Sequence, residues 1–401
     1  MVTTFYPPYH YGGDATYVQR LVDALTARGH QVDVIHCRDS YYLANPQEPE
    51  PGRPAPAGAR IFPLKSRFGK LSPLLTHQTG RPWLKPDIRR RLAGGGYDVI
   101  HFHNASLIGP GAFSYGDAVK LYTTHEHWLL CPLSLLWKKD RELCDSRECV
   151  SCTLRAGRPP QWWRYGSYLQ RQLQHIDRFI SPSRFTRDKH REWGLDLPFD
   201  VLPSFTTAPS VAPVARPHER PYFLFVGRLI KIKGLHTILR TFARYPDADL
   251  VVAGTGGHES ELRALASDLP SVRFVGAQSS EQLQRLYRHA IALIMPSIAY
   301  EVFGLVLIEA FAEGTPALVR NLGGMAEVAT DSGAGILFDT DEGLLDGMRQ
   351  LQTDQAVRAR LGENGRTAFE RMYSEDVHIR GYLSIVERAR LERSTRRKSP
   401  P

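Results

Sequence analysis

The sequence predicts two doubly wound α/β domains joined by a short linker. Patterns of buried strands and helices alternate through both halves of the chain, and glycine-containing loops follow several of the strands. The Pro- and Ala-rich segment 206–221 separates the halves and is typical of a linker. Because ligands of such sheets lie at the carboxyl ends of the strands, we expect the domains to face each other across a cleft. That geometry is more typical of an enzyme than of a scaffold.

The composition is that of a globular protein. With 401 residues, of which 42% are hydrophobic and 23% charged, the chain can form two domains with proper cores. No apolar run is long enough to span a bilayer, and the chain leads from Met1 straight into a strand-like segment rather than a secretory signal. We therefore expect a cytoplasmic protein.

The first predicted domain spans residues 1–205. It opens with a short strand, the glycine pair Gly12-Gly13 and a helical pattern, which together with the next strand form a parallel βαβ unit. The opening strand is so short that we expect the natural start of the chain to lie upstream of Met1. The further strand patterns of this domain lie at 31–37, 97–104, 118–126, 175–190 (a strand, a turn and a helix) and 199–205.

The second predicted domain, residues 222–374, repeats the alternation of strand and helix. An amphipathic helix at 375–392 follows, which we expect to pack back toward the first domain, and 393–401 is expected to be a disordered basic tail. The strand patterns of the second domain lie at 222–229, 248–257, 272–277, 291–297, 316–321 and 335–339. Its helical patterns lie at 234–245, 259–269, 280–290, 302–312 and 341–371.

Positive charge is concentrated in the first half of the chain. Residues 1–203 carry 27 Lys and Arg against 19 Asp and Glu, a net charge of +8, whereas residues 204–401 carry 24 against 23, a net charge of +1. This asymmetry predicts an anionic surface or ligand for the first half. No recognised nucleic-acid-binding motif accompanies the charge, so we expect no nucleic-acid partner.

Basic and aromatic residues interleave in three stretches, "KSRFGK" (65–70), "RPWLKPDIRRR" (81–91) and "RAGRPPQWWR" (155–164). Trp and Arg together suit the headgroup region of a membrane. Solvated basic faces with the Trp rings in a core are an equally good explanation. Our hypothesis is peripheral attachment to the inner face of an anionic membrane that carries a lipid-linked acceptor.

Two glycine-containing turns of the second domain have the composition of a phosphate site. In "FVGRLIKIKGLH" a strand ends in Gly227 and Arg228, and Lys233 follows shortly before the next helix. Such a turn presents backbone N–H groups, a helix N-terminus and fixed cations to a phosphate, although a solvated basic turn is the alternative. The second turn, "VVAGTGGHESEL", contains Gly254 and Gly256, which would allow the close approach of a ligand.

Two glutamates stand in the otherwise apolar stretch "SIAYEVFGLVLIEAFAEGTP", residues 297–316. A helix that is apolar on all sides should be buried, and a buried carboxylate is costly unless it is hydrogen-bonded. We therefore expect Glu309 to point from the helix into a ligand site, where hydroxyl groups of the ligand satisfy it. Glu301 would lie in the loop before the helix. The alternative is a buried structural pair, such as Glu309 with an Arg at a strand end.

The spacing Glu301-x7-Glu309 in "PSIAYEVFGLVLIEAFAEGTPAL", with Gly323-Gly324 and Glu327 after it, resembles the signature of glycosyltransferase family 4. The segment "GRLIKIKG" lies at the matching distance upstream. Members of that family are retaining enzymes with two Rossmann-like domains, the GT-B architecture. The resemblance covers almost the whole chain and is most specific in the second half.

The resemblance implies roles for residues of the second domain. Arg228 and Lys233 would hold the diphosphate of a nucleotide-sugar donor. Glu309 would bind the ribose hydroxyls of the nucleotide, and Glu301 a hydroxyl of the donor sugar. We further expect the donor to contact Gly227, Gly254, Gly256 and the backbone of Phe303, Gly304 and Leu305.

The resemblance also implies roles in the first domain. His125, in "TTHEHW", matches a histidine that reaches the donor sugar, and Gly12-Gly13 match a glycine loop that lines the diphosphate and the acceptor side. No cofactor is required for catalysis, because the departing diphosphate can accept the proton of the acceptor. Arg228 and Lys233 then stabilise the charge that builds on the leaving group.

Four of the five cysteines form the cluster Cys131-x12-Cys144-x4-Cys149-x2-Cys152. Four thiols in a short, charged stretch of a cytosolic protein favour a structural zinc site, in an insert of about 126–160. An iron–sulfur cluster and simple free thiols are the alternatives.

These observations predict a retaining glycosyltransferase that moves a sugar from a UDP- or GDP-sugar to a glycan or lipid-linked acceptor. Cell-envelope polysaccharide or glycoconjugate synthesis is the expected setting. The first alternative is a nucleotide-sugar epimerase of the same architecture, which would need no acceptor. The second is a metal-stabilised binding protein without activity.

Overall fold

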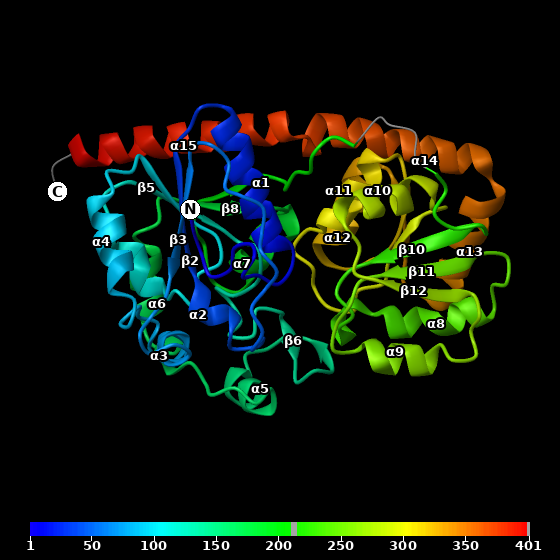
Figure 1. The fold of residues 1–401 in the computed structure, drawn as a ribbon, viewed down its shortest axis with the longest axis horizontal. Helices are drawn as coiled ribbons and strands as arrows, with labels where there is room; N and C mark the ends of the chain where they lie inside the picture. Colours follow the sequence, from blue (N-terminus) through cyan, green and yellow to red (C-terminus); the bar gives the residue numbers. More distant parts are fainter. Residues whose placement is uncertain (210–214, 399–401) are drawn as a thin grey trace. The chain divides into compact units, whose positions relative to one another are not determined.

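The computed structural model describes residues 1–209 and 215–398, which fold into two compact units (Figure 1). Residues 210–214 of the predicted linker and 399–401 of the predicted tail lie outside the described residues. Among the described residues, no helix is both long enough and apolar enough to cross a membrane. Unit 1 comprises Met1–Pro182, Thr186–Leu202 and the chain from Ile379 onward, and unit 2 comprises Ser183–Phe185 and Pro203–His378.

Unit 1 contains a parallel sheet of seven strands in the order β3-β2-β1-β4-β5-β8-β9. The edge strand β3 lies just beyond a Pro- and Gly-rich stretch and was not predicted; it is half exposed and contains Pro63, which only an edge strand accommodates easily. The strands are β1 (Val2–Thr3), β2 (Val32–Cys37), β3 (Ala59–Leu64), β4 (Val99–Phe102), β5 (Val119–Thr123), β8 (Arg178–Ser181) and β9 (Phe199–Val201).

The helices of the chain up to Leu202 connect these strands. α1 buries one face, with Val18, Leu21, Val22 and Leu25 inside, as the helical spacing of these residues predicts. A small antiparallel pair, β6 (Trp137–Lys138) and β7 (Glu142–Leu143), lies between β5 and α5 in the chain. The helices are α1 (Gly13–Ala27), α2 (Arg38–Tyr41), α3 (Leu71–Thr79), α4 (Pro86–Gly94), η1 (Pro110–Ser114), α5 (Cys149–Arg155), η2 (Trp162–Arg164), α6 (Tyr168–Leu173) and α7 (Arg184–Glu192).

Unit 2 contains a parallel sheet of six strands in the order β12-β11-β10-β13-β14-β15. The order reverses between β10 and β13, which is where ligands bind in sheets of this topology. The predicted fold class, two doubly wound α/β domains, is confirmed. The strands are β10 (Tyr222–Val226), β11 (Asp249–Ala253), β12 (Val272–Gly276), β13 (Leu293–Met295), β14 (Ala317–Arg320) and β15 (Gly335–Phe338).

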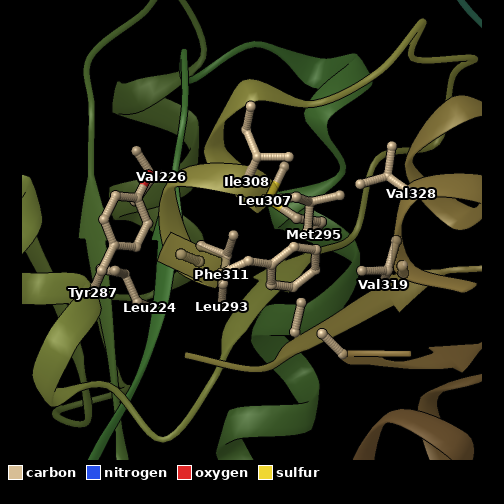
Figure 2. Close-up of a cluster of buried hydrophobic side chains, with 14 of the residues drawn as sticks. Leu224, Val226, Tyr287, Leu293, Met295, Leu307, Ile308, Phe311, Val319 and Val328 are labelled. Carbon is tan, nitrogen blue, oxygen red and sulfur yellow. The ribbon is translucent and has the colours of Figure 1, made fainter. Parts of the chain in front are cut away.

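Both faces of this second sheet are covered. Successive residues of β10 alternate between two hydrophobic clusters, with Leu224 in one and Phe223 in the other. In Figure 2, Leu307, Ile308 and Phe311 of α11 pack against side chains of the sheet. The helices of unit 2 are η3 (Lys231–Lys233), α8 (Leu235–Ala243), α9 (Glu259–Leu265), α10 (Ser280–His289), α11 (Leu305–Ala312), α12 (Gly323–Ser332), α13 (Asp341–Thr353), α14 (Gln355–Ala368) and the π-helix η4 (Phe369–Tyr373).

Helix α15 (Glu375–Lys398) differs from the prediction at its C-terminal end. The sequence predicts a helix that ends at 392 and a disordered tail from 393, whereas the helix continues to Lys398. Arg393 explains the extension, because its Nη1 lies 3.1 Å from Asp177 Oδ2 and donates a hydrogen bond to the Ala118 carbonyl oxygen at 2.6 Å. The part of α15 from Ile379 onward belongs to unit 1.

Replacing Tyr382 with Ala should destabilise unit 1. Its side chain is buried, and its ring stacks on His101 of β4 with a centroid distance of 5.5 Å. We expect a loss of about 3 kcal/mol in the free energy of unfolding. The neighbouring Leu383 is 36% exposed, so Leu383→Ala should cost less than about 1 kcal/mol. Calorimetric unfolding of both variants tests this, and equal midpoints would show that α15 does not stabilise unit 1 through Tyr382.

Candidate functional site

The turns that follow β10 and β11 pack backbone against backbone. A Cβ atom on Gly254, whose φ is +142°, would lie 1.9 Å from the Gly227 carbonyl oxygen. One on Gly256 would lie 2.4 Å from the Leu229 carbonyl oxygen, and the Leu229 N–H donates to the Thr255 carbonyl at 2.9 Å. Packing within the protein therefore already requires glycine at 254 and 256, a reason that the sequence prediction did not foresee. Contact of these glycines with a donor stays a prediction.

The segment after β13 is held in the same way by its two neighbours. Gly234, with φ +72°, ends η3, and a Cβ atom there would lie 2.0 Å from the Pro296 carbonyl oxygen. On the other side, a Cβ atom on Gly324 would lie 2.3 Å from the Val302 carbonyl oxygen. The Gly324 N–H donates to the Glu301 carbonyl at 2.8 Å. The backbone around Glu301 is thus fixed from both sides.

This arrangement brings Lys233 and Glu301 into an ion pair. Nζ of Lys233 lies 2.6 Å from Oε1 of Glu301, and the Ser297 hydroxyl donates to the same oxygen at 3.0 Å. Both charged side chains are about one-fifth exposed, so each remains accessible from solvent. The residue predicted to bind phosphate, Lys233, and the residue predicted to bind the sugar, Glu301, are therefore direct neighbours.

Arg228 lies at the end of β10 with its side chain exposed. In the described part of the chain its guanidinium forms no ion pair and no hydrogen bond, in contrast to Lys233. Its positive charge is therefore available to an anion that reaches the carboxyl edge of the sheet.

Glu309 lies on α11 and is half-buried rather than enclosed. Its Oε2 accepts a hydrogen bond of 3.2 Å from the hydroxyl of Tyr287, a buried residue of α10. One partner of the carboxylate is thus a neutral phenol from the neighbouring helix. Whether Glu309 also pairs with an Arg, the alternative from the sequence, stays a prediction.

A buried acid–base pair does exist next to this helix, at a position that the sequence analysis missed. Glu313, directly after α11, has a side chain that is 3% exposed, and its Oε2 lies 2.8 Å from Arg288 Nε. Burial raises the pKa of the Glu313 carboxyl, and Arg288 acts against this shift. The sequence could have indicated this buried carboxylate, because Glu313 directly follows the apolar run that ends at Ala312.

Helix α11 begins at Leu305, later than the pattern 302–312 predicts. Gly304, with φ +119°, is its N-cap, and Phe303 before it is buried in the core. The first turn of a helix leaves N–H groups without partners inside the helix. They stand at the sheet edge that also holds the Lys233–Glu301 pair, a favourable place for an anion or a hydroxyl group.

In unit 1, His125 lies just after β5 and is half-buried. Its Nε2 is 3.0 Å from Nδ1 of His103, and its ring centroid is 4.8 Å from that of Tyr17. Tyr17 belongs to α1, which begins at Gly13 directly after Gly12 (φ +95°). The structure therefore links His125 to the helix that follows the glycine pair. Sequence reasoning missed His103, although it ends a strand pattern at the same sheet edge.

At the cysteine cluster the structure does not show the predicted zinc site. Among the residues that the structure describes, no three His, Cys, Asp or Glu side chains are grouped so that they could hold a metal ion. The Cys144 thiol donates to the Ser146 carbonyl instead, and the Cys152 sulfur accepts the Lys139 N–H at 3.3 Å.

The four thiols do lie near one another. Burial, followed by the nearby Cys131 and Cys149 thiols, raises the pKa of Cys144 to about 11, so this thiol is protonated at neutral pH. The cysteines form no disulfide among the described residues, and the choice between a metal site and free thiols stays a prediction.

The carboxyl edge of the sheet in unit 2 thus collects groups of complementary chemistry. Arg228 and Lys233 carry positive charge, Glu301 accepts hydrogen bonds, and the start of α11 supplies N–H groups. Glu309 lies further along α11, and its position relative to this group stays a prediction. This set can bind an anion together with a ligand rich in hydroxyl groups.

Two family models match almost the whole chain. The model described as Glycosyltransferase Family 4 matches residues 11–208, and the model described as Glycosyl transferases group 1 matches residues 210–368. The two matches correspond closely to the two sheets.

Individual proteins agree with this assignment. The lipopolysaccharide core biosynthesis glycosyltransferase LpsE of Rhizobium meliloti is 29% identical over 235 residues, which are 56% of this chain and 68% of LpsE. A sucrose-phosphate synthase from Thermosynechococcus elongatus has a similar fold, with a TM-score of 0.72, 20% identity and 99% of each chain covered. Anabaena HepE, solved in complex with UDP and glucose, has a TM-score of 0.66 at 14% identity, with 96% of this chain and 98% of HepE covered.

Replacing Gly254 with Ala should displace the turn that carries Arg228. The new Cβ atom would collide with the Gly227 carbonyl oxygen, and an L-residue is strained at this φ. We expect a loss of about 3 kcal/mol in the free energy of unfolding, together with weaker binding of any ligand of this edge. Gly257→Ala is the matched control, because a Cβ atom there meets nothing within 4 Å. The unfolding temperatures of both variants test this prediction. A Gly254→Ala protein with the unfolding temperature of the parent would refute the packing argument.

Proposed function

This chain belongs to glycosyltransferase family 4 and has the GT-B fold, and on that premise we propose that it is a retaining hexosyltransferase. It moves a sugar from a nucleotide-diphosphate sugar to a glycan or lipid-linked acceptor. The observation that carries the proposal is the Lys233–Glu301 pair at 2.6 Å, because it joins a cation for phosphate and a carboxylate for sugar hydroxyls. Arg228 extends the positive charge at the same sheet edge.

We assign the donor diphosphate to Arg228 and Lys233. A guanidinium and an ammonium ion both form charge-assisted hydrogen bonds to phosphate oxygens. Lys233 would share its charge between Glu301 and the diphosphate, whereas Arg228 has no competing carboxylate among the described residues. Arg228 should therefore contribute more to diphosphate binding than Lys233 does.

We assign hydroxyl groups of the donor to the two glutamates. Glu301 would accept from a hydroxyl of the sugar, and Glu309 from the ribose of the nucleotide. The hydrogen bond from Tyr287 occupies one side of the Glu309 carboxylate and fixes its orientation. A carboxylate has about four acceptor positions on its two oxygens, so Glu309 can accept further donors. The backbone of Phe303, Gly304 and Leu305 would contact sugar or phosphate.

The assignments in unit 1 rest on the sequence resemblance. His125 would bind the donor sugar, and Gly12-Gly13 would line the diphosphate and the acceptor. The structure of HepE contains UDP and glucose, and LpsE is named for lipopolysaccharide core biosynthesis. These names support a UDP-sugar donor, with a GDP-sugar as the alternative, and a glycan or glycolipid acceptor of the cell envelope.

In the proposed reaction the bond between the anomeric carbon and the diphosphate breaks, and the acceptor oxygen bonds to that carbon on the same face. The departing diphosphate takes the proton of the acceptor hydroxyl. Arg228 and Lys233 stabilise the negative charge that develops on the leaving group. No step is assigned to a cofactor.

A panel of nucleotide-sugars, with and without glycan and glycolipid acceptors, tests the proposal. Release of nucleoside diphosphate that depends on the acceptor, with the anomeric configuration kept in the NMR spectrum of the product, is the expected result. Interconversion of the donor sugar without an acceptor would indicate the epimerase. Binding without turnover would indicate the non-catalytic protein.

Arg228→Ala should lower kcat/KM by about 100-fold. The variant lacks the cation that stabilises the negative charge on the leaving group and that no carboxylate of the described residues shares. Arg360→Ala is the matched control, since Arg360 is exposed on α14 and has no role in the proposal. Steady-state kinetics with the donor from the panel measures both. Equal rates for Arg228→Ala and the parent protein would exclude Arg228 from the reaction.

Glu309→Gln should weaken nucleotide binding about tenfold, because a neutral amide replaces a charged acceptor for the ribose hydroxyls. Tyr287→Phe removes only the hydroxyl that orients Glu309 and should have a smaller effect in the same direction. Isothermal titration with nucleoside diphosphates measures both affinities. If the Glu309→Gln protein binds nucleoside diphosphates as tightly as the parent does, Glu309 has only a structural role.

A further inference from the structure

Helix α3 in unit 1 exposes its leucines to solvent and buries polar residues on its opposite side. Its three leucines face outward, with Leu71 57% exposed, Leu74 48% and Leu75 40%. Two of its polar residues, Ser72 and Thr76, are fully buried, and His77, Gln78 and Thr79 are half-buried. A helix of a globular domain normally turns its apolar face to the core. The outward leucines therefore indicate an apolar environment outside the domain.

The polar face of α3 has a reason to be buried. Lys85 lies beneath it with its side chain enclosed, and Nζ of Lys85 donates to Thr76 Oγ1 at 2.7 Å and to the Ser72 carbonyl at 3.4 Å. Because a buried ammonium ion needs acceptors, rotating α3 to hide its leucines would leave Lys85 without them. The exposure of the leucines is thus built into the packing of the domain.

Aromatic residues extend the apolar surface on both sides of α3. Phe68, before the helix, is 44% exposed, and Trp83, after it, is 61% exposed. The short helix η2 packs against α3, with Nε1 of Trp163 donating to the His77 carbonyl at 2.9 Å, and its Trp162 is 64% exposed. The stretch 155–164, singled out in the sequence, therefore contacts the helix that lies between the other two stretches, 65–70 and 81–91. We refer to Phe68, Leu71, Leu74, Leu75, Trp83 and Trp162 as the α3 surface.

The charge around the α3 surface is almost entirely positive. Residues 65–91 contain eight Lys and Arg and a single acid, Asp87, which is paired with Arg90. Residues 150–176 contain four Arg and no Asp or Glu. Exposed Lys65, Arg67 and Lys70 lead directly into α3. A protein partner could match the leucines, but the surplus of cations fits an extended anionic surface best.

We propose that the α3 surface docks unit 1 onto an anionic phospholipid bilayer. The leucines and Phe68 enter the region between headgroups and acyl chains, the exposed Trp rings lie at headgroup level, and the Lys and Arg side chains bind lipid phosphates. This deepens the proposed function, because a lipid-linked acceptor would then lie on the same bilayer. Vesicle binding itself needs neither donor nor acceptor, so it can be tested separately from sugar transfer.

The test is co-sedimentation of the full chain with vesicles of phosphatidylcholine alone and of phosphatidylcholine with phosphatidylglycerol. We expect binding only to the vesicles with phosphatidylglycerol, and a decrease of that binding as salt is raised. The combined variant Leu71→Gln, Leu74→Gln and Leu75→Gln should bind at least about tenfold more weakly. So should the combined variant Lys65→Gln, Arg67→Gln and Lys70→Gln.

Leu265→Gln is the matched control, because Leu265 is 53% exposed on α9 in unit 2 and should not affect vesicle binding. Unchanged unfolding midpoints show that the variants fold. Vesicle binding by the leucine variant equal to that of the parent would overturn the proposal. The proposal would also be overturned if the parent protein did not bind vesicles but dimerised through these leucines. That result would show that a second copy of the chain covers the α3 surface.

Discussion

Close contacts of glycines with neighbouring backbone at one sheet edge are the constraint on which the site depends. The turn after β11 touches the turn after β10 at Gly254, the end of η3 touches the segment after β13 at Gly234, and Gly324 touches that segment from the other side. At each contact a Cβ atom would collide with a carbonyl oxygen, so only glycine allows the loops to approach. The consequence is a fixed backbone at the point where the strand order reverses.

That fixed backbone explains why two opposite charges stand where a ligand would bind. Held by their loops, Lys233 and Glu301 are 2.6 Å apart and still partly open to solvent. In the absence of a ligand each satisfies the other, which avoids an unpaired charge in a half-buried position. A ligand that carries both phosphate and hydroxyl groups could then be bound by both residues without a rearrangement of the backbone. We see in this pair the physical basis of the proposed donor specificity.

The sequence predicted the fold class and most strands, because buried strands of parallel sheets are continuous apolar runs. It also placed Lys233 in the turn after one strand and Glu301 in the loop before a helix, but it could not show that they pair, since the contact depends on two loops 68 residues apart. The hydrogen bond from Tyr287 to Glu309 could not be predicted either, because it joins two different helices. The cysteine spacing predicted that the four thiols lie near one another, but spacing along the chain does not fix where the thiols point. The inverted orientation of α3 depends on Lys85 beneath it, and the leucine pattern alone would have predicted the opposite face inside.

The most direct test is a double-mutant cycle on nucleoside diphosphate binding with Lys233→Met, Glu301→Gln and the combined variant, measured by isothermal titration. If the pair forms one binding unit, the effects of the two changes are not additive, and the coupling free energy is about 1 kcal/mol or more. If both single variants bind as the parent does and the coupling is zero, the Lys233–Glu301 pair is only a structural contact and the donor site lies elsewhere.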